Sequence, residues 1–291
     1  MELEFSLFRH SKPGSGSVYC SKLLPMFPGS FSYKIGWSFL CWYIFASTMK
    51  VCAVNCRRGL SKKRLEIECL AAEENLSILA LSETDLSSHE TPPILDGYEC
   101  ISGSDTSTAR ICVYIKDSIS LSVTKYPGVL PVIVINTFES TWAFLYGEFT
   151  ENAYTVDKIR LSEKERTNRI IDFLLWLSQH SKPLVYCMGD FNIDVSSNSI
   201  SKIRLDNWCK DFNFKQLVKS PTRDAVNCKG HPTSSCINLF ITRSNKKMNI
   251  AFKDCTFSDH KAVFLQIGRF NHKKERIQVR RSRRLRLCMF H

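Results

Sequence analysis

Residues 186–199 read "YCMGDFNIDVSSNS", and an aspartate and an asparagine follow the apolar part of this segment directly. Asp190 and Asn192 come straight after a glycine, and the chain then turns to serines. A buried strand that ends in this way holds a carboxylate and an amide side by side. In an open α/β sheet, ligands bind beyond the carboxyl ends of the strands. The segment therefore indicates a polar site at a strand end.

Other apolar runs end or begin with residues of the same kind. Asn55 follows one strand candidate, Glu83 follows another, and "SDH" places Asp259 and His260 before the final run "KAVFLQI". If the last strand is antiparallel to its neighbours, its starting end lies at the same mouth. Carboxylates and amides with one histidine, and without paired thiolates, suit a hard cation such as Mg²⁺, with Mn²⁺ as a substitute, and a phosphate substrate.

Each of these residues alone has a plainer explanation. Asn55 fits a turn amide, Glu83 a helix cap, Asp190 an Asx turn and His260 a surface histidine. Their joint placement at strand ends favours a site over four unrelated features.

The elements that would position these residues begin with a strand-helix-strand unit. Residues 50–54 and 76–83 are apolar strand candidates, and residues 61–75 between them have a helical pattern. Such a unit is typical of parallel strands. The buried stripe of the helix is expected to comprise Leu65, Cys69 and Ala72.

The middle of the chain predicts antiparallel strands and then a long helix. Four closely spaced strand candidates are "ICVYI", "LSVTKY", "VIVIN" and "WAFLYGEF". In residues 161–183, Ser162 and Glu165 form a capping-box pattern, and Pro183 ends the helical run. The buried face of this helix is expected to comprise Ile170, Leu174 and Leu177. We predict a single mixed α/β domain over residues 49–267.

The two ends of the chain differ from this domain in composition. Residues 1–48 form a predicted leader, in which the apolar run 35–46 is shorter than the roughly 20 residues that a membrane span needs. Residues 268–291 form a basic tail with nine Lys or Arg and one Glu, which carries +8 of the formal net charge of +12. This tail suits a polyanion such as nucleic acid, or is a solvated terminus without a partner. Thirteen scattered cysteines without a CxxC pair favour reduced thiols in an intracellular protein.

The motifs "NCRRGL", "LALSETD", "GDFN" and "FSDHKAVF", in this order, resemble those of the endonuclease/exonuclease/phosphatase superfamily. Within it, "ILDGYEC", "VYIKD", "SPTRD" and "CINLFITRS" are most similar to the apurinic-like endonuclease domain of non-LTR retrotransposons. The resemblance covers residues 49–267. It implies a four-layer α/β sandwich, in which two mixed β-sheets pack face to face with helices on the outside.

The resemblance also implies roles for the strand-end residues. Glu83 would hold Mg²⁺, and Asn55 would help to place the metal or the substrate phosphate. Asp259 would contact the metal and act at the scissile phosphate. Asp190 would orient or deprotonate the attacking water. Asn192 would bind the phosphate, and His260 would stabilise charge on the phosphate oxygens.

Two positions depart from the family pattern. Asn238 stands where the family usually has the aspartate that orients the histidine. "YGEF" stands where the retrotransposon enzymes usually have a Tyr-Arg-Pro-Pro-like stretch. Tyr146 is retained there as a predicted site residue, with a core aromatic as the alternative.

The predicted function is Mg²⁺-dependent hydrolysis of DNA phosphodiesters, at a reduced rate, by a nuclear protein without a membrane anchor or an obligate protein partner. Secretion stays open as an alternative location. A catalytically impaired nucleic-acid-binding remnant and a phosphatase or lipid phosphodiesterase are the alternative functions.

Overall fold

Strand β1 (Met49–Asn55) belongs to the first of two six-stranded sheets, and it is buried from Val51 to Asn55. Val51 and Ala53 belong to the cluster between the sheets, whereas Cys52 and Val54 belong to the cluster under helix α2 (Arg64–Glu73). Alternate residues of a strand point to opposite faces, so a strand covered on both sides is apolar throughout. β1 and β2 (Ile78–Ser87) pair in parallel, as the strand-helix-strand pattern predicted.

The structure is a computed structural model, and the residues that it describes all belong to the unit Ala46–His291. They are residues 49–87, 90–103, 108–151, 159–226 and 229–268. The predicted leader and all but the first residue of the predicted basic tail lie outside them, so the division into leader, domain and tail stays a prediction. No helix within these ranges is long and apolar enough to cross a membrane.

Each sheet has a parallel pair of strands at its centre and antiparallel strands around it. The first sheet has the order β15 (Met248–Lys253), β16 (Ala262–Ile267), β1, β2, β4 (Thr108–Lys116) and β3 (Tyr98–Gly103). The second has the order β11 (Lys215–Gln216), β14 (Asn238–Arg243), β10 (Leu184–Asp190), β7 (Ser140–Tyr146), β6 (Val132–Asn136) and β5 (Ser122–Thr124). β10 and β7 form the parallel pair of the second sheet.

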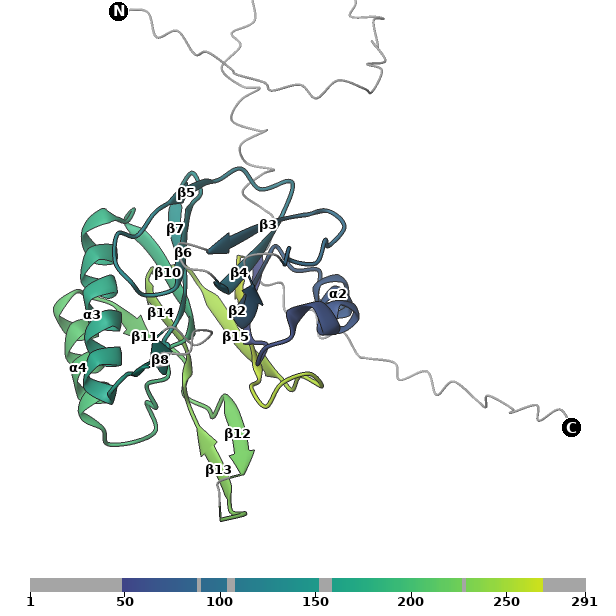
Figure 1. The fold of residues 1–291 in the computed structure, drawn as a ribbon. Helices are drawn as coiled ribbons and strands as arrows, with labels where there is room; N and C mark the ends of the chain where they lie inside the picture. The colour runs from purple at the N-terminus through teal and green to yellow at the C-terminus, as the bar shows by residue number, and fades with distance from the viewer. Residues whose placement is uncertain (1–48, 88–89, 104–107, 152–158, 227–228, 269–291) are drawn as a thin grey trace, which may run out of the picture. The chain divides into compact units, whose positions relative to one another are not determined.

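Helices cover the outer faces of both sheets. The 3-10 turn η1 (Leu60–Lys63) and α2 cover the first sheet, and α3 (Glu163–His180) and α4 (Ile200–Asp211) cover the second (Figure 1). Two short ribbons complete the fold, β8 (Thr150–Glu151) with β9 (Ile159–Arg160) and β12 (Arg223–Val226) with β13 (Pro232–Ser235). The architecture is the predicted four-layer α/β sandwich.

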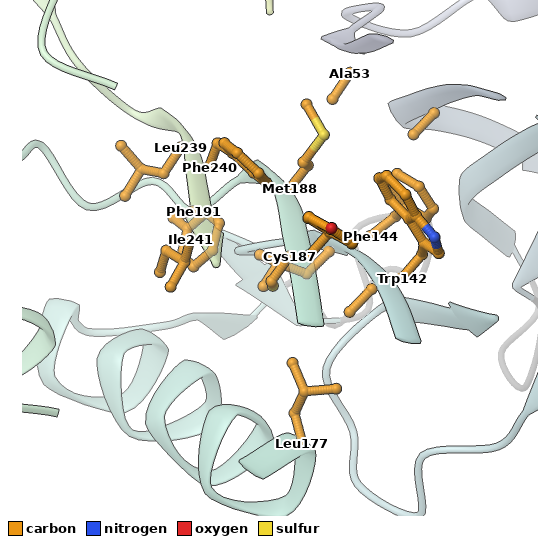
Figure 2. Close-up of a cluster of buried hydrophobic side chains, with 14 of the residues drawn as sticks. Ala53, Trp142, Phe144, Leu177, Cys187, Met188, Phe191, Leu239, Phe240 and Ile241 are labelled. Atoms are coloured by element: carbon orange, nitrogen blue, oxygen red, sulfur yellow. The ribbon is translucent and has the colours of Figure 1, made fainter. Parts of the chain in front are cut away.

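Aromatic side chains fill the space between the sheets. Trp142 and Tyr186 are opposite each other on β7 and β10, and their rings stack with centroids 4.3 Å apart. In Figure 2, Met188 points toward Ala53 of the other sheet, whereas Cys187 lies on the side of Leu177 of α3. The second sheet is therefore buried on both faces, and its central strands have little freedom to shift.

Helix α3 has the predicted start and the predicted face. Ser162 is its N-cap, and both hydrogen bonds of the capping box with Glu165 are present. The predicted face is fully buried and consists of Ile170, Leu174 and Leu177. α3 ends at His180, three residues before Pro183.

The predicted buried stripe of α2 is wrong. Leu65 is 71 % exposed, and Cys69 and Ala72 are exposed as well. The helix turns the stripe Ile67, Leu70 and Ala71 toward the first sheet instead. Its apolar residues surround the helix nearly evenly, so periodicity gave little information about the face that would be covered.

We expect Leu70→Ala to lower the free energy of unfolding by about 2–4 kcal/mol, because it removes buried methyl groups and leaves a cavity. Leu65→Ala, one turn away on the same helix, should change it by less than about 0.5 kcal/mol. Urea unfolding of both variants checks the face of α2. Equal losses for the two substitutions would contradict the burial described here.

Candidate active site

The carboxyl ends of both parallel pairs point to one mouth of the sandwich. β1 ends at Asn55, β7 at Tyr146 and β10 at Asp190. β2 does not end at Glu83 as predicted, because it continues to Ser87 past a register shift between Ser82 and Leu86. Glu83 lies in this irregularity with a φ of 54°, a conformation that releases its side chain from the regular alternation of the strand.

A buried hydrogen bond joins the two sheets at this mouth. Asn55 Nδ2 donates to Asp190 Oδ2 over 2.7 Å, and the side chains are 2 % and 1 % exposed. Asn55 Oδ1 accepts from the backbone N–H of Arg57, and Asp190 Oδ1 accepts from that of Asn192. Burial raises the pKa of Asp190 to about 7, although the hydrogen bonds from Asn55 and Asn192 oppose the shift.

Glycine is required in the strand end that presents Asp190. Gly189 has a φ of 147°, and a Cβ added there would lie 2.0 Å from the carbonyl oxygen of Leu145. After the strand, Asn192 has a φ of 50°, and its Nδ2 donates to the Gly147 carbonyl over 2.7 Å. Asn192 was predicted to bind phosphate, but its Nδ2 already donates a hydrogen bond to the loop after β7.

The turn before β16 brings His260 to the same mouth. Ser258 Oγ donates to the Asn55 carbonyl over 2.6 Å and accepts from the His260 backbone N–H. β16 is antiparallel to β1, as the placement of this turn required. His260 Nδ1 lies 3.9 Å from Asp190 Oδ2, so the histidine and the aspartate meet at the floor of the site.

Asn238 lies directly against His260. The distance from His260 Nδ1 to Asn238 Oδ1 is 3.2 Å, and Asn238 Nδ2 donates to the Lys261 carbonyl over 3.3 Å. Burial lowers the pKa of His260 to about 4, with Arg223 and Arg57 adding to the shift and Asp259 opposing it. This network assigns the proton of the neutral imidazole to Nδ1, which leaves Nε2 as an acceptor toward the pocket.

Arginines surround the acidic residues of the site, and sequence reasoning did not assign them to it. Arg223 Nε lies 3.0 Å from Asp259 Oδ2, Arg57 Nη1 lies 3.6 Å from Asp259 Oδ1, and Arg58 Nε lies 3.7 Å from Glu83 Oε1. Burial alone would raise the pKa of Asp259, but the hydrogen bond and charge of Arg223 outweigh it and lower the pKa. The signal was present, since the arginines occur in "NCRRGL" and "SPTRD", which carried the resemblance.

All predicted residues except Asn238, which lies behind His260, line one pocket of about 400 Å³. The complete lining is Asn55, Arg57, Arg58, Glu83, Tyr146, Phe149, Asp190, Asn192, Arg223, Asp259 and His260. A shallower cavity continues from it along β12 and β13 and shares Arg57, Arg223 and Asp259. The mouth is thus polar, with both signs of charge.

The donor set fits a hard cation. Glu83, Asp259 and Asn55 line one pocket, and Asp259 Oδ1 is buried without a hydrogen-bond partner, whereas Asn55 Oδ1 already accepts from the Arg57 N–H. Within the described ranges, no group of three or more His, Cys, Asp or Glu could hold a metal ion alone. Mg²⁺ commonly uses one or two carboxylates together with water and substrate phosphate, so the two observations agree.

A second ionic network lies behind Tyr146. The guanidinium of Arg110 has Nε 2.8 Å from Asp85 Oδ1 and Nη1 3.1 Å from Glu148 Oε1, and it covers the Tyr146 ring at 4.9 Å. Burial raises the pKa of Tyr146, and the charge of Glu83 adds to the shift. Tyr146 is 3 % exposed, so the predicted site residue lines the pocket and is also part of the core. Asp85, Arg110 and Glu148 were not predicted, because nothing in their local sequence shows that two sheets bring them together.

We expect Arg110→Met to lower the free energy of unfolding by about 3–5 kcal/mol, because it removes a buried cation from the buried carboxylate of Asp85 and the partly buried one of Glu148. Arg58 also lies 3.0 Å from Asp85, but its side chain is 65 % exposed. Arg58→Met should therefore cost no more than about 1 kcal/mol. Denaturant unfolding at pH 7 compares the two, and a similar cost for both would mean that Arg110 does not stabilise the network.

Comparison with known proteins identifies the fold. No family model matches the sequence, and no curated protein matches it either. Among solved structures, the endonuclease domain of TRAS1, a telomere-specific non-LTR retrotransposon, matches with a TM-score of 0.55 and 16 % identity. The match covers 76 % of this chain and 99 % of that one.

Two further structures have the same architecture. An AP endonuclease from Archaeoglobus fulgidus matches with a TM-score of 0.54 and 12 % identity over 75 % of this chain and 98 % of its own. A mannosyl-6-phosphatase from Bacteroides thetaiotaomicron matches with a TM-score of 0.50 and 14 % identity over 75 % and 99 %. The described part of the chain therefore has the fold that these two endonucleases and this phosphatase share.

Proposed function

We propose that the protein is a metal-dependent phosphodiesterase that nicks DNA slowly. The observation that carries this proposal is the meeting of buried Asp190 and His260, 3.9 Å apart, at the floor of a polar pocket. Hydrolysis of a phosphodiester requires a placed water, neutralisation of charge on the phosphate and a stabilised leaving oxygen. The pocket offers a separate group for each of these tasks.

Asp190 is the proposed group that orients and deprotonates the attacking water. Its Oδ2 is held by Asn55 and its Oδ1 by the backbone of Asn192, so the carboxylate has a single orientation. A base held in this way does not have to be ordered during the reaction, which is the advantage of a preorganised site. Asn192 lies at the same strand end, where its amide is proposed to contact the substrate phosphate.

The arginines suit the phosphate. Arg57 and Arg58 are 60 % and 65 % exposed. Their ion pairs with Asp259 and Glu83 are longer than 3.5 Å, and Arg58 also lies 3.0 Å from Asp85. Exposed pairs of this kind contribute little, so the guanidinium groups can turn to a phosphate at small cost. Guanidinium groups bind phosphate through two parallel hydrogen bonds. We propose that these side chains hold the phosphates on either side of the scissile one.

Glu83, Asn55 and Asp259 are the residues that would hold Mg²⁺, or Mn²⁺ in its place. A divalent cation bound there would supply charge neutralisation at the phosphate. Release of Glu83 from its loose pair with Arg58 would leave its carboxylate available to the cation. Asp259 is next to His260 in the chain, so its carboxylate is proposed to lie at the scissile phosphate as well.

His260 is the proposed partner of the phosphate oxygens, and Asn238 limits it. In the neutral imidazole, Nε2 is an acceptor and gives no hydrogen bond to phosphate. Protonation would turn Nε2 into a donor, but Asn238 supplies no negative charge to favour the imidazolium. This limitation is the reason for proposing slow hydrolysis.

DNA is the proposed substrate because of charge and resemblance together. The predicted tail adds nine Lys or Arg that would contact DNA phosphates whatever the base sequence. A DNA substrate also agrees with the predicted nuclear location. The TRAS1 structure is that of an endonuclease domain, and at 16 % identity its substrate is carried to this chain as a proposal only. Asn238 also favours a second candidate, a DNA-binding remnant without turnover.

We expect Asp190→Asn and His260→Ala each to abolish Mg²⁺-dependent nicking of supercoiled plasmid, while both variants unfold cooperatively like the parent. Glu83→Gln should instead raise the Mg²⁺ concentration that gives half the maximal rate, because it weakens a metal ligand without touching the base. Glu90→Gln, on the loop after β2, serves as the matched control and should leave the rate unchanged. A parent that binds DNA but never nicks it would establish the binding remnant in place of the nuclease.

Asn238→Asp tests the reason for the slow rate. In the serine-protease triad the reverse exchange lowers turnover by roughly 10⁴. We expect a smaller gain here, about 10- to 100-fold, because the metal shares the stabilisation of charge. The pKa of His260, followed by NMR, should rise in the variant. The new carboxylate also meets the Lys261 carbonyl, so the unfolding midpoint is measured beside the rate. A stable variant that is no faster and has an unshifted histidine would show that Asn238 does not limit the reaction.

A further inference from the structure

An aromatic ring lies at the rim of the candidate active site and is not used by the proposed chemistry. Phe149, the last residue of "YGEF", lines the same pocket as Asp190 and His260 and is 40 % exposed. Asp190 and His260 are 1 % and 4 % exposed, so they form the floor and the ring stands above them at the edge. An exposed aromatic ring beside buried polar groups suits a ligand with a flat face that can stack on the ring.

The backbone fixes the position of Phe149 relative to the site. The N–H of Gly147 donates to the Asp190 carbonyl over 2.7 Å, and Asn192 Nδ2 donates to the Gly147 carbonyl over 2.7 Å. On the other side, the N–H of Leu161 donates to the Phe149 carbonyl over 3.0 Å. The residue is thus tied on one side to the strand end that presents the proposed base, and on the other to the start of α3.

A half-buried arginine supports one face of the ring. The guanidinium carbon of Arg166, on α3, lies over Phe149 at 4.0 Å from the ring centroid. Its Nε and Nη1 are buried without hydrogen-bond partners, and burial lowers the pKa of Arg166. Buried donors without partners are costly, and the contact with the Phe149 ring is the interaction that offsets the cost. One face of the ring therefore packs against Arg166, and the ring is 40 % exposed and lines the pocket.

We propose that Phe149, backed by Arg166, is a stacking platform for an unpaired nucleotide base next to the scissile phosphate. This inference rests on the proposed function and names its substrate class: single-stranded or locally unpaired DNA. Bases inside a duplex have both faces covered by their neighbours, so a protein ring can stack only on a base that has left the duplex. Arg57, Arg58 and Arg223 line the same pocket and suit the flanking phosphates.

Binding of two DNA probes to the full chain tests the platform. The probes are a single-stranded oligonucleotide that carries 2-aminopurine and the hairpin duplex of the same sequence, both measured in EDTA at one salt concentration. Stacking of one base on one aromatic ring corresponds to about a 5- to 150-fold change in affinity. The parent should quench the 2-aminopurine of the single strand and should bind it more tightly than the duplex.

The variants separate stacking from simple apolar contact. In Phe149→Ala and Phe149→Leu, the ratio of single-strand to duplex affinity should fall about fivefold or more, and the quenching should be lost. Phe149→Trp should keep both, because it keeps a π face. Phe138→Ala is the matched control, since Phe138 is 88 % exposed and precedes the opposite end of β7. Its ratio should equal that of the parent.

The results distinguish this inference from the proposed function. If the parent nicks DNA with Mg²⁺ but Phe149→Ala keeps the parent ratio and the quenching, the platform is wrong and the nuclease stands. If the parent quenches 2-aminopurine through Phe149 but never cleaves a phosphodiester, the platform stands and the nuclease is wrong. A parent that binds neither probe overturns the platform, and the nicking assay with Mg²⁺ then decides the nuclease separately.

Discussion

The hydrogen bond between Asn55 and Asp190 is the contact on which the candidate site depends. It joins the last residue of β1 in one sheet to the last residue of β10 in the other, and both side chains are almost completely buried. Each of these strands belongs to the parallel pair of its sheet, so face-to-face packing brings two sets of carboxyl ends to one mouth. Trp142 and Tyr186, stacked on neighbouring strands of the second sheet, belong to the apolar layer that packs between the sheets. A site that is built across two sheets in this way requires the whole sandwich.

Charge in this site is balanced by arginine. Asp259 lies between Arg223 and Arg57, Glu83 lies near Arg58, and the network of Asp85, Arg110 and Glu148 continues the alternation behind Tyr146. A cation would take the place of the arginine beside each carboxylate, and a phosphate would take the place of the carboxylate beside each arginine. The cation and the phosphate are therefore expected to bind together more tightly than either does alone. At Asn238 the carboxylate that the resemblance led us to expect is missing, and burial lowers the pKa of the neighbouring His260. The candidate site thus has the groups to which we assign the water and the phosphate, and it lacks a carboxylate against its histidine.

Much of this arrangement could be predicted from local sequence, because it depends on short-range rules. The strand ends at Asn55 and Asp190 follow from apolar runs that stop at polar residues, and the start of α3 follows from the capping box of Ser162 and Glu165. The buried face of α2 could not be predicted, since the stripe that contains Leu65 and the stripe that contains Leu70 are both apolar. Only packing against the sheet decides which of them is buried. Glu83 was assigned to a strand end, but it lies in an irregularity that depends on pairing with β4. The partners of Arg110 are Asp85 in β2 and Glu148 in the segment after β7, and no spacing in the sequence shows such a contact.

The rate of Mg²⁺-dependent plasmid nicking by Asn55→Ala, compared with the parent at saturating Mg²⁺, tests the account most directly. Loss of the amide leaves Asp190 Oδ2 without its partner and the carboxylate without a fixed orientation. A misplacement of about 1 Å at a reacting group costs roughly 10²-fold in rate, and an unsatisfied buried acceptor costs about 1–3 kcal/mol of stability. The account predicts a rate at least about 100-fold lower in a protein that is still folded. A folded Asn55→Ala variant that nicks DNA as fast as the parent would contradict it.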